Sequence, residues 1–271
     1  MTEQEPDPAE LMKIAVEVAR EAARTAGEMR LAGVSGLATK STATDVVTAA
    51  DRAVERQVVA ALRELRPDDA VLGEEYGDAV PAAPARVRWI LDPIDGTVNY
   101  LYGLPNYAVS LAAEVNGRVV AGVVRNAATG AEWTATVGGG AFRDGERLHG
   151  SAQTDLAQAL VATGFGYDAA RRVHQARVLV GLMSKVRDIR RFGAAALDLC
   201  LAAEGQVDVY YEKGLNLWDH AAGGLVAAEA GLLVTGLGAA PVGSDMVVAA
   251  PPALFPALQE QLIRLDAAGG P

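Results

Sequence analysis

The sequence predicts an α/β protein with an α+β N-terminal half and an α/β C-terminal half. Residues 87–143 consist of short apolar segments separated by Asn-Gly, Gly-rich and Asp-Gly turns, a pattern typical of antiparallel strands. After about residue 150, strand-like and helical segments alternate instead. The chain has 271 residues, of which 51% are hydrophobic and 21% charged, so it can bury a sizeable core. We place the boundary between the halves at about Ser151, giving domains 1–150 and 151–271.

The N-terminal half begins with two predicted helices. Asp7 offers an N-cap and Pro8 suits the first helical position, and Gly33 marks the exit. Apolar residues recur at helical spacing between them: Leu11, Ile14, Ala15, Val18 and Ala22. A second helix is predicted over residues 49–65, with an apolar face and Pro67 beyond its end. That face comprises Val54, Val58, Ala61, Leu62 and Leu65.

The remaining elements follow from the same patterns. Strands are predicted at 87–91, 107–115, 118–125, 131–137 and 141–143, which together form an antiparallel meander. In the C-terminal half we expect strands at 159–163, 207–211, 232–234 and 246–249. Helices are expected there at 169–184, 193–203, 218–230 and 252–265. This alternation favours a parallel or mixed sheet.

Charge and cysteine content exclude several classes of protein. The chain has 34 acidic and 24 basic residues, a formal net charge of −10, which disfavours binding to nucleic acid or anionic membranes. The same charge repels anionic metabolites, so a phosphate substrate needs positive charge that the sequence does not count. Cys200 is the single cysteine, the N-terminus has no apolar signal region, and no stretch fits a membrane span. We therefore expect a cytoplasmic protein.

The sharpest motif is Asp92-Pro93-Ile94-Asp95-Gly96-Thr97, which follows the predicted strand at 87–91. We expect Pro93 to stop the strand, Gly96 to allow a tight turn and Thr97 to begin a helix. Two carboxylates on one turn beside a helix N-terminus can hold a hard divalent cation and a phosphate together. The structural alternative is a β-turn with a capping Asp and Thr.

Three further segments carry acids at element ends. Gly73-Glu74-Glu75 follows a short apolar stretch, and its alternative is a solvated loop. Asp219 lies at the predicted start of the helix at 218–230, where it can also be a plain N-cap. Thr48 and Asp51 fit a capping box, so a purely structural role is open there too.

Taken together, these segments resemble the inositol monophosphatase family of magnesium-dependent, lithium-sensitive phosphatases. The most specific matching strings are residues 92–100 and 218–231, and residues 73–75, 48–51 and 210–214 match as well. The resemblance runs from the first helix to near the C-terminus. It implies a layered αβαβα sandwich of the inositol monophosphatase and fructose-1,6-bisphosphatase type, with metal-binding loops in residues 1–150 and a site completed by 151–271. The family is usually dimeric, which implies a homodimer.

The resemblance also assigns roles. Glu74, Asp92 and the Ile94 carbonyl resemble the ligands of a first Mg²⁺, and Asp92, Asp95 and Asp219 those of a second, with Glu74 helping to hold a third. Asp51 and Thr97 resemble the pair that orients and deprotonates the attacking water. The backbone N–H groups of Gly96 and Thr97 resemble a phosphate cradle. Asp95, Asp219, Gly193, Ala195 and Glu212 match positions near the substrate.

The implied function is Mg²⁺-dependent hydrolysis of a small phosphate ester, myo-inositol monophosphate, by a metal-activated water, with two or three Mg²⁺ ions per site. Ala194 stands where many members have Ser or Thr, which leaves the substrate open. Alternatives within the family are histidinol phosphate, fructose 1,6-bisphosphate and 3′-phosphoadenosine 5′-phosphate. An alternative of another class is a protein partner in transcription complexes.

Other motifs do not carry a function. Residues 36–41 lack the glycine that a P-loop needs before Lys40. We expect Lys40 to be an exposed lysine, and the alternative is that it approaches a metal-bound water or an acidic loop. Residues 164–169 match a dinucleotide-binding glycine pattern but lack a well-placed acid downstream. The motif at residues 92–97 is also similar to the aspartyl-phosphate loop of haloacid-dehalogenase phosphatases. The two aspartates of that loop are two positions apart, whereas Asp92 and Asp95 are three apart, which disfavours that class. Cys200 lies in an apolar helix and reads as a buried structural thiol.

Overall fold

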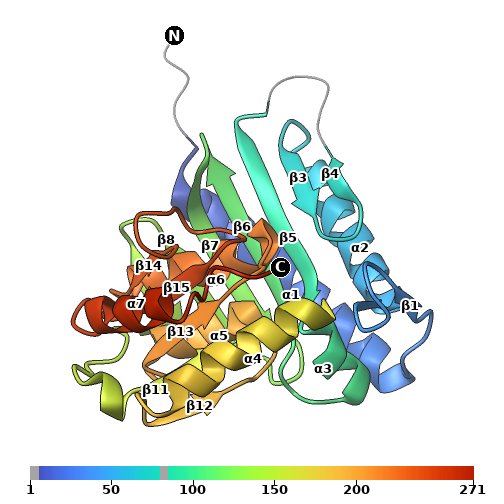
Figure 1. The fold of residues 1–271 in the computed structure, drawn as a ribbon. Coiled ribbons are helices and arrows are strands. Elements are labelled where there is room, and N and C mark those ends of the chain that lie inside the picture. Colours follow the sequence, from blue (N-terminus) through green and yellow to red (C-terminus); the bar gives the residue numbers. More distant parts are fainter. Residues whose placement is uncertain (1–5, 80–84) are drawn as a thin grey trace.

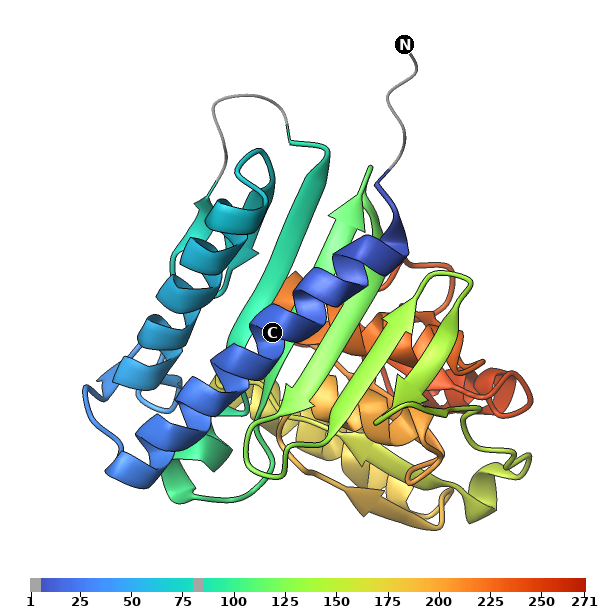
Figure 2. The ribbon, with the colours of Figure 1, turned by 180° about the vertical axis from the view of Figure 1, so that it is seen from behind.

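Five layers of secondary structure make up the computed structural model, which describes residues 6–79 and 85–271. Helices α1 (Pro8–Ala32) and α2 (Ala49–Leu65) cover the outer face of an eight-stranded sheet (Figure 2). Helices α5 (Ala195–Ala203) and α6 (Leu217–Glu229) lie between this sheet and a five-stranded sheet. Helices α4 (Ala169–Met183) and α7 (Phe255–Arg264) form the last layer (Figure 1). The predicted αβαβα sandwich is confirmed.

The eight-stranded sheet contains the predicted meander. Its spatial order is β10 (Glu146–Arg147), β9 (Gly140–Arg143), β8 (Glu132–Thr136), β7 (Arg118–Asn126), β6 (Ala108–Val115), β5 (Val87–Asp95), β3 (Ala70–Gly73) and β4 (Gly77–Ala79). Neighbours are antiparallel except β3 and β5, which run parallel. Asn116 and Gly117 both have positive φ, as do Asp144 and Gly145, so both predicted hairpin turns form as the sequence indicates.

The five-stranded sheet is mixed. Its order is β12 (Asp188–Arg190), β11 (Leu160–Thr163), β13 (Val209–Glu212), β15 (Val247–Ala250) and β14 (Leu233–Thr235). The first three strands are parallel, and β15 is antiparallel to β13 and β14. The sequence did not predict β12, a short edge strand with charged residues at both ends. The sequence also gave no signal for the small hairpin of β1 (Ala38–Thr39) and β2 (Val46–Val47).

The two outer helices begin where their capping signals predict. Asp7 Oδ1 accepts a hydrogen bond of 2.9 Å from the Ala9 N–H, and α1 ends at Gly33, whose φ is 105°. Helix α2 begins after the Thr48–Asp51 capping box. Leu65 is 49% exposed at the last residue of α2, so its predicted place on the core face was wrong.

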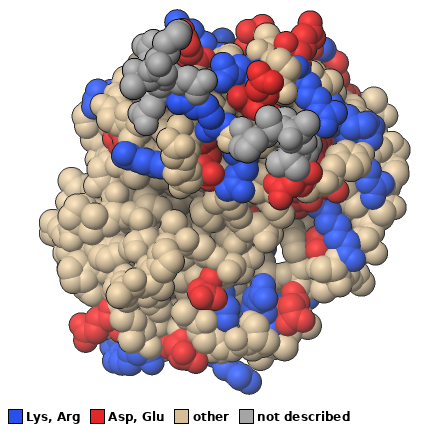
Figure 3. Space-filling model, turned by 90° about the horizontal axis from the view of Figure 1, so that it is seen from above, with Lys and Arg blue, Asp and Glu red and all other residues tan. Residues whose placement is uncertain are grey.

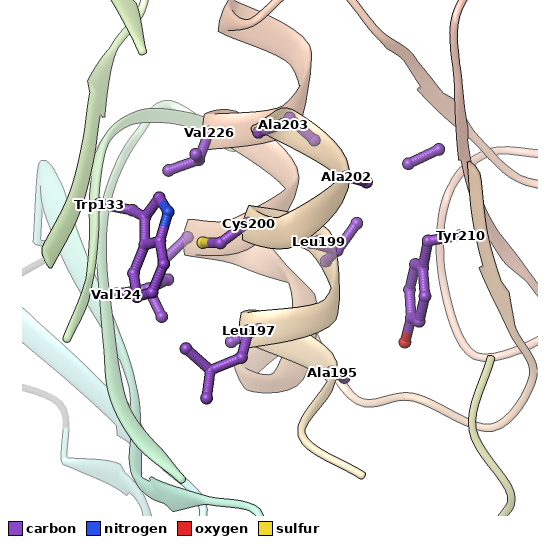
Figure 4. Close-up of a cluster of buried hydrophobic side chains, with 14 of the residues drawn as sticks. Val124, Trp133, Ala195, Leu197, Leu199, Cys200, Ala202, Ala203, Tyr210 and Val226 are labelled. Atoms are coloured by element: carbon purple, nitrogen blue, oxygen red, sulfur yellow. The ribbon is translucent and has the colours of Figure 1, made fainter. Parts of the chain in front are cut away.

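The central layer is tightly packed between the sheets. Figure 4 shows Leu197 and Cys200 of α5 directed toward Trp133 and Val124 of the large sheet, with Tyr210 of the smaller sheet on the other side of the helix. A Cβ on Gly223 would lie 2.8 Å from the Ala196 carbonyl oxygen, so glycine allows α5 and α6 to approach. Cys200 is fully buried, as expected of a structural thiol.

The chain passes from the large sheet to the smaller one between Arg147 and Leu160. Residue 151 lies within this connection. The division into domains 1–150 and 151–271 stays a prediction. None of the helices in the described ranges is long and apolar enough to cross a membrane.

Candidate active site

One cavity of about 490 Å³ lies where the two halves of the chain meet. Both halves supply its lining, and nearly all the candidate residues named from the sequence are in it: Glu74, Asp92, Ile94, Asp95, Gly96, Thr97, Gly193, Ala195, Glu212 and Asp219. Asp51 is the exception. It is fully buried at the start of α2 and reaches the cavity only through Thr97.

The end of β5 delivers Asp92 and Asp95 to the cavity. The prediction that Pro93 stops the strand was wrong. Strand β5 continues to Asp95, and its register against β6 shifts between the two aspartates. A proline is tolerated there because the irregularity removes the need for its missing N–H. The Ile94 N–H donates to Asp92 Oδ1 at 3.0 Å.

Gly96 turns the chain from β5 into the short helix α3 (Thr97–Tyr102). Its φ is 86°, and a Cβ would lie 2.9 Å from the Asn106 carbonyl oxygen, so a side chain is excluded by conformation and by space. Asn99 of α3 donates through Nδ2 to the Phe192 carbonyl oxygen at 2.8 Å. This bond ties α3 to the loop before α5, a role that the sequence did not indicate.

Asp95 joins the two halves directly. Its carboxylate accepts hydrogen bonds from the backbone N–H groups of Ala195 at 3.2 Å and Ala196 at 2.8 Å, at the N-terminus of α5. The positive end of the helix dipole favours a carboxylate there. Asp219 lies in the first turn of α6, where Oδ2 accepts from the Asn216 N–H at 2.6 Å. Asn216 is the N-cap, and Asp219 is the third residue of the helix.

Glu74 follows β3 on a turn that a second buried acid holds in place. Glu55 of α2 accepts the N–H groups of Glu75 at 2.8 Å and Tyr76 at 3.0 Å. A Cβ on Gly73 would lie 2.1 Å from Glu55 Oε1, so this glycine makes room for the carboxylate. The sequence analysis missed Glu55. The available signal was an acid four residues after Asp51, on the helix face that carries Val54 and Val58.

Lys40 also contacts this acidic turn. Its ammonium group bonds Glu74 Oε1 at 2.8 Å and pairs with Glu75. The residue is exposed, as the sequence favoured, but its side chain is only 24% exposed and makes the contact with an acidic loop that was the alternative. Thr42 and Thr44, on the same hairpin loop, donate to the Tyr167 carbonyl oxygen, so the loop spans the two halves.

The acids of the cavity destabilise one another's charged forms. Burial, followed by repulsion from Glu74, Asp95 and Asp219, raises the pKa of Asp92 well above its ordinary value. Burial raises the pKa of Asp219 in the same way, with repulsion from Asp95 and Glu74 next. The pKa of Asp95 rises to about 7, chiefly through burial. A multivalent cation would relieve both the burial cost and the repulsion.

The donor chemistry of the cavity fits a hard divalent cation. The residues that line it offer carboxylate and carbonyl oxygens and no His or Cys. Within residues 6–79 and 85–271, however, no three His, Cys, Asp or Glu side chains form a ready-made metal cluster. Lys40 holds Glu74, and backbone N–H groups hold Asp92, Asp95 and Asp219. The assignment of individual metal ligands therefore stays a prediction.

Basic side chains line the same cavity, which the sequence analysis did not foresee. Besides Lys40, they are Arg171 at the start of α4 and Arg191 in the loop before α5. The Arg191 guanidinium lies 6.0 Å from the centroid of the Phe165 ring. Positive charge near the cavity thus comes partly from the chain itself. On the face seen in Figure 3, by contrast, Lys and Arg are interspersed with Asp and Glu, and the described residues form no extended basic patch.

The comparisons with known proteins agree with this fold, which is that of a class of layered phosphatases. The inositol monophosphatase family model matches residues 7–265. The chain belongs to the inositol monophosphatase family, whose members are generally metal-dependent phosphatases acting on small phosphate esters.

Individual relatives carry two kinds of name. An inositol-1-monophosphatase of Mycobacterium leprae is 45% identical and covers 98% of each chain. The Mycobacterium tuberculosis SuhB structure matches with a TM-score of 0.82 at 41% identity, over 97% of this chain and 99% of that one. A Pseudomonas aeruginosa protein named Nus factor SuhB is 39% identical over 83% of this chain and 86% of its own.

Proposed function

We propose that this chain is a Mg²⁺-dependent phosphomonoesterase that hydrolyses myo-inositol monophosphates, such as inositol 1-phosphate, to inositol and phosphate. One observation carries the proposal. A single cavity is lined by four acids with raised pKa values, by Thr97, whose hydroxyl is hydrogen-bonded to Asp51, and by Glu212. The acids are Glu74, Asp92, Asp95 and Asp219.

In this proposal these four acids hold two or three Mg²⁺ ions. Glu74, Asp92 and the Ile94 carbonyl serve one ion, and Asp92, Asp95 and Asp219 serve another. Bound Mg²⁺ supplies the positive charge that neutralises the carboxylates and the phosphate and that lowers the pKa of water. Every other task falls to the chain.

Asp51 and Thr97 orient the attacking water and receive its proton. The backbone N–H groups of Gly96 and Thr97 bind the phosphate oxygens. Lys40, Arg171 and Arg191 attract the phosphate to a cavity that acids would otherwise close to anions. Gly193, Ala195 and Glu212 contact the hydroxyl groups of the alcohol. Positioning and charge stabilisation account for most of the catalysis in phosphoryl transfer.

The test is phosphate release from a panel of esters: inositol 1-phosphate, histidinol phosphate, fructose 1,6-bisphosphate and 3′-phosphoadenosine 5′-phosphate. Each is measured with Mg²⁺, with EDTA and with Mg²⁺ plus Li⁺. We expect the highest kcat/KM for inositol 1-phosphate, no turnover in EDTA and inhibition by Li⁺. A tenfold preference for histidinol phosphate would contradict the proposed substrate but not the proposed phosphatase activity. Equal turnover with Mg²⁺ and with EDTA would show that the reaction does not require a metal ion.

A second candidate function is suggested by the relatives named Nus factor SuhB, at 37–39% identity. A chain of this kind binds transcription proteins independently of catalysis. The Asp92→Asn variant separates the two functions, since it removes a proposed metal ligand and leaves the surface unchanged. Binding of purified RNA polymerase by both wild type and variant would support the second function, and binding by neither would exclude it. The homodimer and the cytoplasmic location also remain proposals, the former open to light scattering.

A further inference from the structure

The buried Tyr210 on strand β13 contacts the partly buried Glu212, and the family resemblance assigns no role to Tyr210. The two residues are two positions apart, so their side chains lie on the same face of the sheet. The Tyr210 ring is fully buried beside α5, as Figure 4 shows, and its hydroxyl donates to Glu212 Oε2 at 2.7 Å. Glu212 in turn lines the cavity. A core residue is thus bonded directly to a residue of the site.

The Glu212 carboxylate has little freedom to move. A Cβ on Gly164 would lie 1.9 Å from Glu212 Oε2, so the carboxylate fills the space that this glycine leaves open. The Tyr210 hydroxyl is its one hydrogen-bond donor among residues 6–79 and 85–271. The other oxygen, Oε1, accepts no hydrogen bond within these ranges and is left for a ligand.

The surroundings of Glu212 make that hydrogen bond important. Burial raises the pKa of Glu212 to about 7, while the Tyr210 hydroxyl and then Arg191 act in the opposite direction. Asp198 of α5 is another buried acid nearby, and burial, followed by repulsion from Glu212, raises its pKa well above its ordinary value. No hydrogen bond joins Asp198 to Glu212 within the described residues, so Tyr210 is the group that keeps Glu212 oriented.

We propose that Tyr210 is a positioning residue: its hydroxyl fixes Glu212 so that Oε1 accepts a hydrogen bond from a hydroxyl group of the substrate. The cavity then selects phosphate esters of polyhydroxylated alcohols over esters whose alcohol has no hydroxyl donor. This inference rests on the proposed phosphatase function and adds the residue that positions Glu212, the proposed contact to the alcohol.

The neighbouring tyrosine provides a matched control. Tyr211 is also buried, but on the opposite face of β13, in the outer core with Leu182 and Leu258. It makes no hydrogen bond to Glu212 within the described residues, whereas Tyr210 does. Tyr210→Phe and Tyr211→Phe therefore remove the same atom from adjacent positions of one strand, and only the first removal affects Glu212.

The experiment compares wild type, Tyr210→Phe and Tyr211→Phe on two substrates. One is whichever hydroxyl-bearing ester of the panel the wild type hydrolyses best, and the other is p-nitrophenyl phosphate, whose alcohol part has no hydroxyl donor. For Tyr210→Phe we expect KM to rise about tenfold on the first substrate, the size of a hydrogen bond to a charged group. We expect kcat and KM on p-nitrophenyl phosphate to change less than twofold, and Tyr211→Phe to match wild type on both.

A double-mutant cycle tests whether Tyr210 acts through Glu212. If it does, Tyr210→Phe adds nothing to Glu212→Gln, and the double variant has the KM of Glu212→Gln alone. Additive effects, an unchanged KM, or equal losses on both substrates would overturn the inference. If Tyr210→Phe does not fold, equal losses in Glu212→Gln on both substrates also overturn it, and a selective KM rise there supports it. Failure of inositol phosphate as the substrate appears separately, in the wild-type panel.

Discussion

The hydroxyl of Thr97 lies 3.1 Å from Oδ1 of the buried Asp51 and 3.1 Å from the carbonyl oxygen of Ile94. The N–H and the hydroxyl of Thr48 occupy the other carboxylate oxygen, Oδ2. Thr48 therefore holds one oxygen of the Asp51 carboxylate, and the other oxygen faces the Thr97 hydroxyl. Burial raises the pKa of Asp51, which makes it a stronger base once ionised. In the proposed mechanism, Thr97 connects the cavity to the Asp51 carboxylate, which does not itself line the cavity.

Replacing Thr97 by Ala tests this relay. We expect kcat to fall by about 100-fold, the lower range for loss of general base catalysis, with KM changed less than threefold. Thr97→Ser keeps the hydroxyl and should restore most of kcat. Steady-state kinetics on the preferred ester measure both constants. A rise in KM with kcat unchanged would show that Thr97 binds substrate and does not orient water.

Asp92→Asn tests the proposed role of Asp92 as a metal ligand. The variant keeps Oδ1, which accepts the Ile94 N–H, so the turn after β5 should fold as before. It loses the charge shared between two proposed metal ions, and we expect turnover to fall by about a thousandfold or more. Asp188→Asn, at an exposed carboxylate on β12, is the control and should retain full activity. Activity of Asp92→Asn within tenfold of wild type contradicts the assignment.

The sequence predicted the layers of the fold well because their signals are local. Asp7, Gly33 and the Thr48–Asp51 capping box fix the ends of α1 and α2 within the segments themselves. The Asn116-Gly117 turn likewise sets a hairpin from two residues. Strand β12 and the β1–β2 hairpin carry no such signal, since each is a few residues long and forms only against a neighbouring strand.

The candidate site was predictable where its residues form continuous strings. Residues 92–97 and Asp219 could be named for that reason, and they line one cavity. Glu55 and Arg171 could not, because their roles arise from contacts between distant segments, and for Lys40 a contact with an acidic loop was only the alternative to an exposed lysine. Lys40 meets Glu74 from 34 residues away, and nothing in the residues around it distinguishes it from a surface lysine.

Lys40→Met should strengthen metal binding. The Lys40 ammonium group bonds Glu74 and Glu75, and so occupies a carboxylate that the proposed first metal ion needs. Removing this competing cation should lower the Kd for Mg²⁺ several-fold, which titration calorimetry without substrate measures directly. Lys185→Met, at an exposed lysine after α4, should leave the Kd unchanged. Weaker Mg²⁺ binding by Lys40→Met would mean that the ammonium group supports the ion instead of competing with it.

The stability of the metal-free protein should fall as pH rises from 5.5 to 7.5. Burial raises the pKa of Asp95 and of Glu212 to about 7, and it also raises those of Asp92 and Asp219 well above their ordinary values. The folded chain therefore binds protons that the unfolded chain has released. The free energy of unfolding therefore decreases with pH, by about 1.4 kcal/mol per pH unit for each proton of difference. His220 acts in the opposite direction, because burial lowers its pKa, but it is a single group.

Thermal unfolding in EDTA at three pH values measures this slope, and we expect Tm to fall by about 2–4 °C per pH unit. Mg²⁺ should reverse the trend, since carboxylates must lose their protons to bind a metal ion, so the gain in Tm on adding Mg²⁺ should grow with pH. Asp92→Asn removes one of the titrating groups and should flatten the slope in EDTA. A Tm that rises with pH in EDTA would show that the buried acids are already ionised and stabilised by the chain alone, which would remove the electrostatic reason for a metal at this site.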